Sequence, residues 1–233
     1  MKLINRFLTA IAFIVVTSSA NAYEVRLGYA TLTDNSNTGI IQLSSYIRNH
    51  DVFVIQNLQS LNNARRILNT LNVYSNEYSI QTTRVNPNSE GRSEAIIWRN
   101  TSVDYDGNYA QYSLYTSGFT SAPLSIAFKT RQAGGHPFIV SSFDIKSNLH
   151  NKWQAGQFMN QYVRHLNDRF KNYRLKVFIG DGVFVPSNVS GFHKTETGFY
   201  VPENLNRNHI DVNFGNTGIK TLTINFPDSR VVN

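Results

Sequence analysis

The order of its short apolar segments constrains the fold of this chain most. Near the amino terminus, the apolar runs 24–32 and 51–58 are each followed by a segment with apolar residues at helical spacing. These two helical patterns consist of Ile40, Leu43, Tyr46 and Ile47, and of Leu61, Ala64, Ile67, Leu68 and Leu71. Run 51–58 is apolar almost throughout, which is typical of a strand buried on both faces. The first third of the chain is therefore predicted to be β-α-β-α.

Strand-like runs fill the middle of the chain. They cover 77–85, 94–100, 109–117, 123–130 and 136–145, and are separated by Asn-Pro, Gly-Arg, Asp-Gly and Gly-Gly, which favour turns. A helix is then predicted over about 150–171, because one helical stripe contains Trp153, Phe158, Tyr162, Val163, Leu166 and Phe170. The last predicted strands are LKVFIGD, HIDVNFGN and KTLTINF.

Two halves that each combine strands and helices predict an α/β fold with two packed sheets and helices outside, a four-layer α/β/β/α sandwich. In α/β folds, ligands bind at the carboxyl ends of the central strands. We therefore expect a functional site where the runs 24–32, 51–58, 136–145 and 177–181 end.

The amino terminus has the pattern of a secretory signal. Lys2 and Arg6 precede the apolar run FLTAIAFIVV, and Ala20-Asn21-Ala22 provides a small-residue cleavage site. The run has about ten residues, whereas a membrane-spanning helix needs about 20. We predict a signal peptide over 1–22, a single domain over 23–233, and a secreted or periplasmic protein.

Composition narrows the class of protein further. With 41% hydrophobic residues the chain can bury a core, and with no cysteine it must do so without disulfides. Loss of Lys2 and Arg6 lowers the formal charge of +7 to +5. Such a charge favours nucleic acid or anionic lipid as a partner, but it also serves solubility alone.

The predicted strand ends carry a resemblance to a known family. In chain order the relevant blocks are RLGYATL, SSYIRNHDVFVIQNL, EAIIWRN, GFTSAPLSIAF, PFIVSSFDIKS, VFIGDGV and NHIDVNF. Their order and spacing resemble the endonuclease/exonuclease/phosphatase superfamily, and among its secreted members the nuclease subunit of cytolethal distending toxins. The resemblance implies a deoxyribonuclease I-like sandwich.

The resemblance also implies positions for the family's catalytic groups. It puts the first-strand Asn on Thr31, the metal-binding Glu on Asn57, the phosphate-contacting Arg on Ser121, the general-base His on Asp144, the strand-end Asp on Asp181, its neighbouring Asn on Val183, and the late Asp on Asp211. Arg99 corresponds to the Arg of the family's aromatic-Arg pair. The family's terminal Ser-Asp-His has only a vague counterpart around Asp228.

Most of these substitutions remove the chemistry that the family requires. Val183 cannot orient water, and Asp144 has no imidazole to act as the base. Asn57 offers a neutral oxygen to a metal that prefers an anionic one. Asp144, Asp181 and Asp211 are then remnant catalytic positions, and Asn57 and Arg99 are candidate binding residues. This interpretation gives a catalytically degenerate binding protein with no cofactor.

Alternative interpretations remain open. Asp144, Asp181 and Asp211, with or without Asp228, could form a rebuilt carboxylate site for Mg²⁺ or Ca²⁺ in an active nuclease or phosphodiesterase, or Asp181 could simply cap backbone N–H groups. A degenerate member would bind a toxin-like partner subunit, a host molecule or a phosphate-bearing ligand, with nucleic acid also possible, or it could be purely structural.

Other polar residues suggest weaker sites. His136 and His209 stand at strand starts, which is the wrong end for a catalytic base, and are predicted to be surface residues. A set of basic residues could face phosphate or could be solvated helix faces and ends: Arg65, Arg66, Lys171, Arg174 and Lys176.

Overall fold

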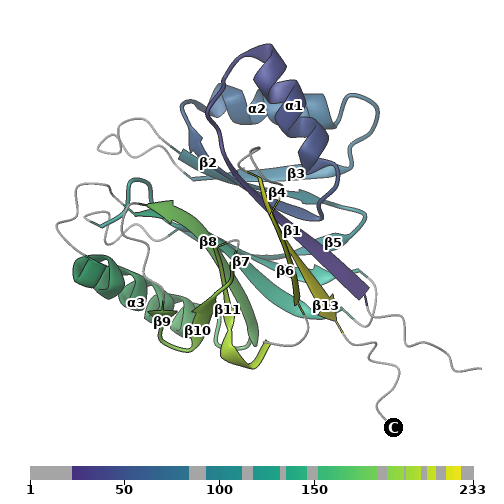
Figure 1. Ribbon diagram of the computed structural model, residues 1–233. Coiled ribbons are helices and arrows are strands. Elements are labelled where there is room, and N and C mark those ends of the chain that lie inside the picture. Colours follow the sequence, from purple (N-terminus) through teal and green to yellow (C-terminus); the bar gives the residue numbers. More distant parts are fainter. Residues whose placement is uncertain are drawn as a thin grey trace, which may run out of the picture.

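The computed structural model describes residues 23–83, 93–111, 118–131, 135–145, 152–182, 188–196, 198–205, 209–213 and 219–226. The predicted signal peptide, Val183 and Asp228 lie outside these ranges. Within them the chain forms two mixed sheets packed face to face, with helices on both outer faces (Figure 1). The α/β/β/α sandwich is confirmed.

The first sheet contains the parallel pair formed by the first two strands of the chain. Its strand order is β12 (His209–Asn213), β13 (Lys220–Phe226), β1 (Tyr23–Thr31), β2 (Val52–Leu58), β4 (Ser93–Arg99) and β3 (Tyr78–Thr82). Strands β1 and β2 are parallel, and the other neighbours are antiparallel. Helices α1 (Asn37–Ile47) and α2 (Leu61–Leu71) cover its outer face.

The second sheet has the same plan around another parallel pair. Its order is β5 (Val103–Gln111), β6 (Leu124–Thr130), β7 (Pro137–Ile145), β8 (Leu175–Gly182), β11 (Phe199–Pro202), β10 (Phe192–Lys194) and β9 (Asn188–Val189). A short 3₁₀ helix, Glu203–Leu205, follows β11 in the chain. Strands β7 and β8 are parallel. Helix α3 (Lys152–Arg169) covers the outer face.

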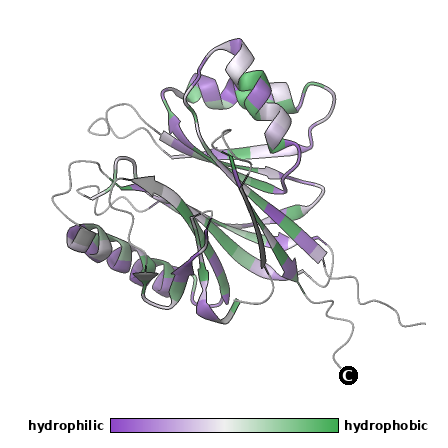
Figure 2. Cartoon of the chain, in the orientation of Figure 1, coloured by the Kyte–Doolittle hydropathy of each residue, from purple (hydrophilic) through white to green (hydrophobic). Residues whose placement is uncertain are grey.

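Apolar side chains from both sheets fill the space between them. Figure 2 shows hydrophobic residues along the strands where the sheets face each other. The shared core includes Leu27, Val54, Ile96, Ile126, Phe138, Val140, Val177 and Leu222, all at most 1% exposed. Burying this much apolar surface is the main force that holds the two sheets together.

The helices begin where serine caps the chain. Ser36 and Ser60 precede α1 and α2, and each side-chain oxygen accepts a hydrogen bond from the backbone N–H three residues later. Such a cap satisfies a backbone donor that the helix itself leaves unpaired. The two predicted helices of the first third are therefore confirmed.

Three sequence interpretations are wrong. Trp153 and Tyr46 were assigned to helical stripes but are 68% and 37% exposed, because with 3.6 residues per turn Tyr46 lies at the margin of the buried stripe of α1 and Trp153 lies outside that of α3. Asp106-Gly107 does not end a strand, since β5 continues through it with a β-bulge between Tyr105 and Tyr109. Lys176 is not a solvated cation, because it is 7% exposed on β8.

Candidate functional site

The carboxyl ends of the two parallel pairs meet at one edge of the sandwich, which we call the rim. Thr31 pairs with Gln56 at the end of β1 and β2, and Asp144 pairs with Asp181 at the end of β7 and β8. The Gln56 side-chain amide crosses between the sheets and donates a hydrogen bond to the Phe143 carbonyl. The strand ends expected to form a site are therefore at the same edge.

A buried acid, Glu94, joins the sheets just inside the rim. Strand β4 runs antiparallel to β2, so the start of β4 lies beside the end of β2. The Glu94 side chain is 1% exposed and accepts hydrogen bonds from Ser121 Oγ at 2.5 Å and from Ser142 Oγ on β7. We call these three residues the Glu94 cluster.

The backbone before β6 holds Ser121 in place. Thr120 N–H donates to the Asp144 carbonyl at 2.7 Å, and Phe119 forms an isolated β-bridge with Ile145. These contacts fix the segment before β6 against the end of β7. The position that the family resemblance gives to a phosphate-contacting Arg is thus a serine turned inward onto Glu94.

The surroundings of Glu94 favour its neutral form. Burial raises the pKa of the Glu94 carboxyl well above its usual value, and nearby Asp144 raises it further, while the Ser121 hydrogen bond acts in the opposite direction. Burial dominates, because an ionised carboxylate loses far more solvation than one hydroxyl returns. A neutral carboxyl is a poor ligand for a hard divalent cation.

Gln56, Tyr29 and Thr31 at the rim are also bonded within the protein. Gln56 is 1% exposed, and its Oε1 accepts from the Tyr29 hydroxyl at 2.8 Å. The Tyr29 oxygen also lies 2.9 Å from Thr31 Oγ1. The position that corresponds to the family's first-strand Asn, Thr31, is therefore part of an internal chain of hydrogen bonds.

Asn57 has an unusual backbone. Its φ of 61° lies in the left-handed region, which asparagine tolerates better than most residues, and the pairing of β2 with β4 shifts register between Ile55 and Leu58. The side-chain amide of Asn57 donates to the Leu32 carbonyl at 2.9 Å. This candidate binding residue thus fastens the end of β1.

The remaining acidic candidates are placed by backbone register. Asp144 is half-buried at the rim and pairs with Asp181, while Asp211 pairs with Leu222 on β13, next to β1. The structure does not describe the side chains of Asp181 and Asp211. Among the side chains it does describe, no group of three His, Cys, Asp or Glu residues could hold a metal ion.

Arg99 is not brought together with the other candidates. It ends β4, about 17 Å along the strand from Glu94, because β4 runs away from the rim. Its guanidinium donates to the Tyr78 hydroxyl at 2.7 Å and to the Arg48 carbonyl, and it lies over the Tyr78 ring. Arg99 therefore links β3 and β4 to α1 at the opposite edge.

His136 and the basic residues are also away from the rim. His136 directly precedes β7, so its predicted position at the start of a strand is confirmed. Its ring stacks on Phe226 with 5.4 Å between ring centroids. Arg66 on α2 donates to the Asn35 carbonyl, whereas Lys171 follows α3 on the other sheet. The predicted basic set is thus divided between opposite faces of the sandwich.

Sequence reasoning missed Glu94. A signal was present, since an acid at the start of the apolar run EAIIW has no solvent-facing role in a strand that is otherwise buried. Its position at the rim follows only from the antiparallel direction of β4, which the sequence does not reveal.

The architecture matches that of solved structures with little sequence similarity to this chain. The crystal structure of truncated TDP2 from Caenorhabditis elegans superposes with a TM-score of 0.56 and 12% identity over 87% of this chain and 98% of that one. An endonuclease/exonuclease/phosphatase from Beutenbergia cavernae DSM 12333 gives 0.58 and 9% over 88% and 72%. No family model and no curated protein matches the sequence. The chain has the fold of the endonuclease/exonuclease/phosphatase superfamily, as the resemblance implied.

No helix in the described part of the chain combines the length and the hydrophobicity needed to cross a membrane.

Proposed function

We propose that this chain, which has a deoxyribonuclease I-like fold, is an exported, catalytically degenerate member of that superfamily that acts by binding rather than by hydrolysis. The amino-terminal pattern of Lys2, the apolar run and Ala22 supports export. The candidate partners are a toxin-like subunit, a host molecule or a phosphate-bearing ligand held without turnover.

One observation carries this proposal: the buried polar side chains of Glu94 and Gln56 at the rim are used to close the sandwich. Glu94 is held between Ser121 and Ser142, and both ends of the Gln56 amide are bonded inside the protein. A phosphodiesterase needs ionised ligands and a base that face the substrate. Here the corresponding region stabilises the fold instead.

The proposal predicts no metal-dependent turnover. Purified protein is incubated with supercoiled plasmid and with a phosphoinositide panel, in Mg²⁺ or Mn²⁺ and in EDTA. We expect the same background with and without metal, because loss of a single catalytic group typically lowers such rates by about 10² to 10⁴. The variants Asp144→Ala and Asp181→Ala should match the parent protein.

The competing interpretation is an active enzyme that uses replacement carboxylates. It draws support from the pairing of Asp144 with Asp181 at the ends of neighbouring strands. Turnover that needs metal and disappears in both aspartate variants would establish this enzyme and refute the binding-only proposal. Turnover that persists in both variants would come from a contaminating nuclease and leaves the expected absence of activity intact.

A further inference from the structure

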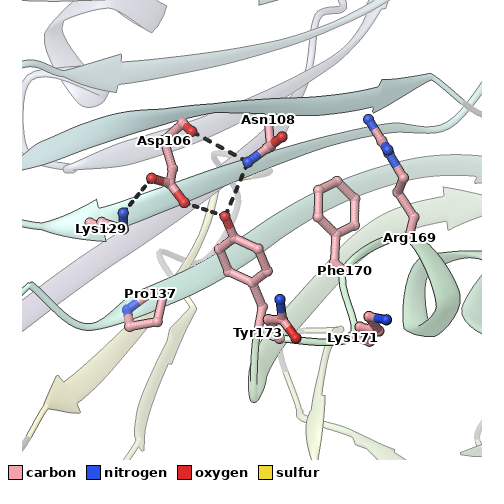
Figure 3. Close-up of a pocket in the computed structure, with 9 residues that line it drawn as sticks. Asp106, Asn108, Lys129, Pro137, Arg169, Phe170, Lys171 and Tyr173 are labelled. Atoms are coloured by element: carbon pink, nitrogen blue, oxygen red, sulfur yellow. Dashed lines mark hydrogen bonds and ion pairs between the residues drawn. The ribbon is translucent and has the colours of Figure 1, made fainter.

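A hollow lies at the edge opposite the rim. It has a volume of about 420 Å³ and lies where α3 ends and where β7 and β8 begin (Figure 3). It is lined by Asp106, Asn108, Lys129, Pro137, Arg169, Phe170, Lys171, Asn172 and Tyr173. We call it the basal cavity. Its size is within the range of small-molecule sites.

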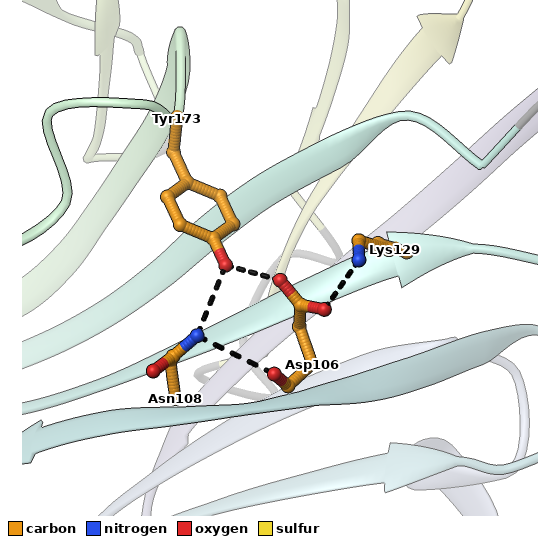
Figure 4. A network of polar contacts seen from close by, with 4 residues as sticks. All are labelled: Asp106, Asn108, Lys129 and Tyr173. Carbon is orange, nitrogen blue, oxygen red and sulfur yellow. Dashed lines mark hydrogen bonds and ion pairs between the residues drawn. The ribbon is translucent and has the colours of Figure 1, made fainter.

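One wall of the basal cavity is fixed by a network of polar contacts. The bulge in β5, with Gly107 at a φ of 75°, brings Asp106 and Asn108 to the cavity. The Asp106 carboxylate binds Lys129 Nζ at 2.5 Å and accepts a hydrogen bond from the Tyr173 hydroxyl (Figure 4). Asn108 Nδ2 lies 3.4 Å from the same hydroxyl. This wall is therefore in place before any ligand arrives.

Aromatic packing and a buried lysine hold Tyr173 from behind. Its ring meets Phe170 edge to face at 5.7 Å between centroids. Lys176, only 7% exposed, donates from Nζ to the Tyr173 carbonyl at 2.6 Å. Burial lowers the pKa of the Lys176 amine, so this lysine serves to fix the Tyr173 backbone rather than to add charge to the cavity.

The opposite side of the basal cavity carries two exposed cations, Arg169 and Lys171. Neither makes a hydrogen bond or ion pair to another side chain that the structure describes. Figure 3 shows both on the far side of Phe170 and Tyr173 from the Asp106–Lys129 pair. Three cationic side chains against the one carboxylate of Asp106 leave the lining with a formal charge of +2.

This lining offers donors and positive charge, together with the ring faces of Tyr173 and Pro137. A guanidinium binds oxyanions through paired N–H groups, and an ammonium adds a point charge. A phosphomonoester carries close to two negative charges at neutral pH, which matches the formal charge of the lining. We propose that the basal cavity binds a small phosphate-bearing molecule, with the phosphate between Arg169 and Lys171 and an attached ring against Tyr173.

Calorimetric titration of the full secreted chain tests this site. The probes are inorganic phosphate and ribose 5-phosphate at low ionic strength, which separate binding of the anion from binding of an attached ring. We expect saturable one-to-one binding that weakens with added salt. The double variant R169Q/K171Q should bind at least about tenfold more weakly, because it loses charge-assisted hydrogen bonds.

Two further variants locate the effect. Arg164→Gln removes an exposed cation from the same helix without touching the cavity, and it should bind like the parent protein. Tyr173→Phe keeps the ring but loses the contact with Asp106, and we expect it to weaken ribose 5-phosphate several-fold more than inorganic phosphate. Unfolding curves confirm that each variant is folded.

Either of two results would overturn the proposal. The first is that neither probe shows saturable binding. The second is that R169Q/K171Q and the control R164Q weaken binding to the same extent. The site does not depend on the proposed function of the rim. Metal-dependent turnover at the rim would leave these titrations unchanged, and failure of the titrations would leave the turnover assays unchanged.

Discussion

Gly180→Ala is expected to lower the free energy of unfolding by about 3 kcal/mol. A Cβ at this position would lie 2.1 Å from the Phe143 carbonyl oxygen and 2.6 Å from its ring. Gly180 pairs with Phe143 between β8 and β7, so neither strand can move away without loss of the ladder. The same carbonyl accepts the Gln56 hydrogen bond across the sheets, which the substitution would also disturb.

Gly156→Ala is the matched control for this prediction. Gly156 lies inside α3, and a Cβ there meets nothing within 4 Å. Because glycine is unfavourable inside a helix, this variant should be more stable than the parent by about 0.5–1 kcal/mol. Urea unfolding measures both changes. Equal effects of the two substitutions would show that the contact between β7 and β8 is looser than described.

The position of Gly180 explains how a Gly-Asp strand end can persist without catalysis. Packing against Phe143 requires the glycine whatever chemistry follows it. A Gly-Asp pair at the end of a buried strand is therefore weaker evidence for an active site than its place in the family pattern suggests. The residues that neighbour it in space, rather than the motif, decide what the rim can do.

Local hydrophobic patterns predicted the helices and strands that the core buries on one face or on both faces. The apolar run of β2 and the strong periodicity of α2 each match the structure, because burial imposes the pattern directly. The prediction of a turn at Asp106-Gly107 was wrong because a bulge accepts the same residues as a turn. Trp153 was misassigned because, with 3.6 residues per turn, it lies outside the stripe of buried residues on α3.

The candidate site was predictable only in part, because strand direction matters as much as strand position. Parallel pairs place the ends of β1, β2, β7 and β8 together, and the connecting helices made that predictable. Glu94 and Arg99 belong to an antiparallel strand. Its start meets the rim and its end leaves it, so Glu94 was missed and Arg99 was grouped with residues far from it.

Glu94→Gln is expected to make the protein more stable at neutral pH. Below the ordinary carboxyl pKa of 4.5, Glu94 is protonated in both the folded and the unfolded chain. Above it, the unfolded chain releases the proton while the folded chain retains it, because its pKa is raised. The free energy of unfolding then falls by about 1.4 kcal/mol per pH unit until the folded pKa is reached.

Glutamine lacks this titration and keeps the two serine contacts, since its oxygen can accept from one hydroxyl and its amide can donate to the other. We therefore expect E94Q and the parent protein to have similar stability near pH 4, and the gap to widen in favour of E94Q as the pH rises. Urea unfolding at a series of pH values measures the difference. Glu77→Gln, at an exposed position, controls for the loss of a surface carboxylate.

Parallel pH curves for the parent protein and E94Q would reverse the interpretation of the rim. They would mean that Glu94 is ionised in the folded protein despite its burial, and a buried carboxylate anion is stable only with a strong compensating charge. A bound divalent cation would be the natural source of that charge. The pH dependence of stability therefore tests, without any substrate, whether the rim stabilises the fold or holds a metal.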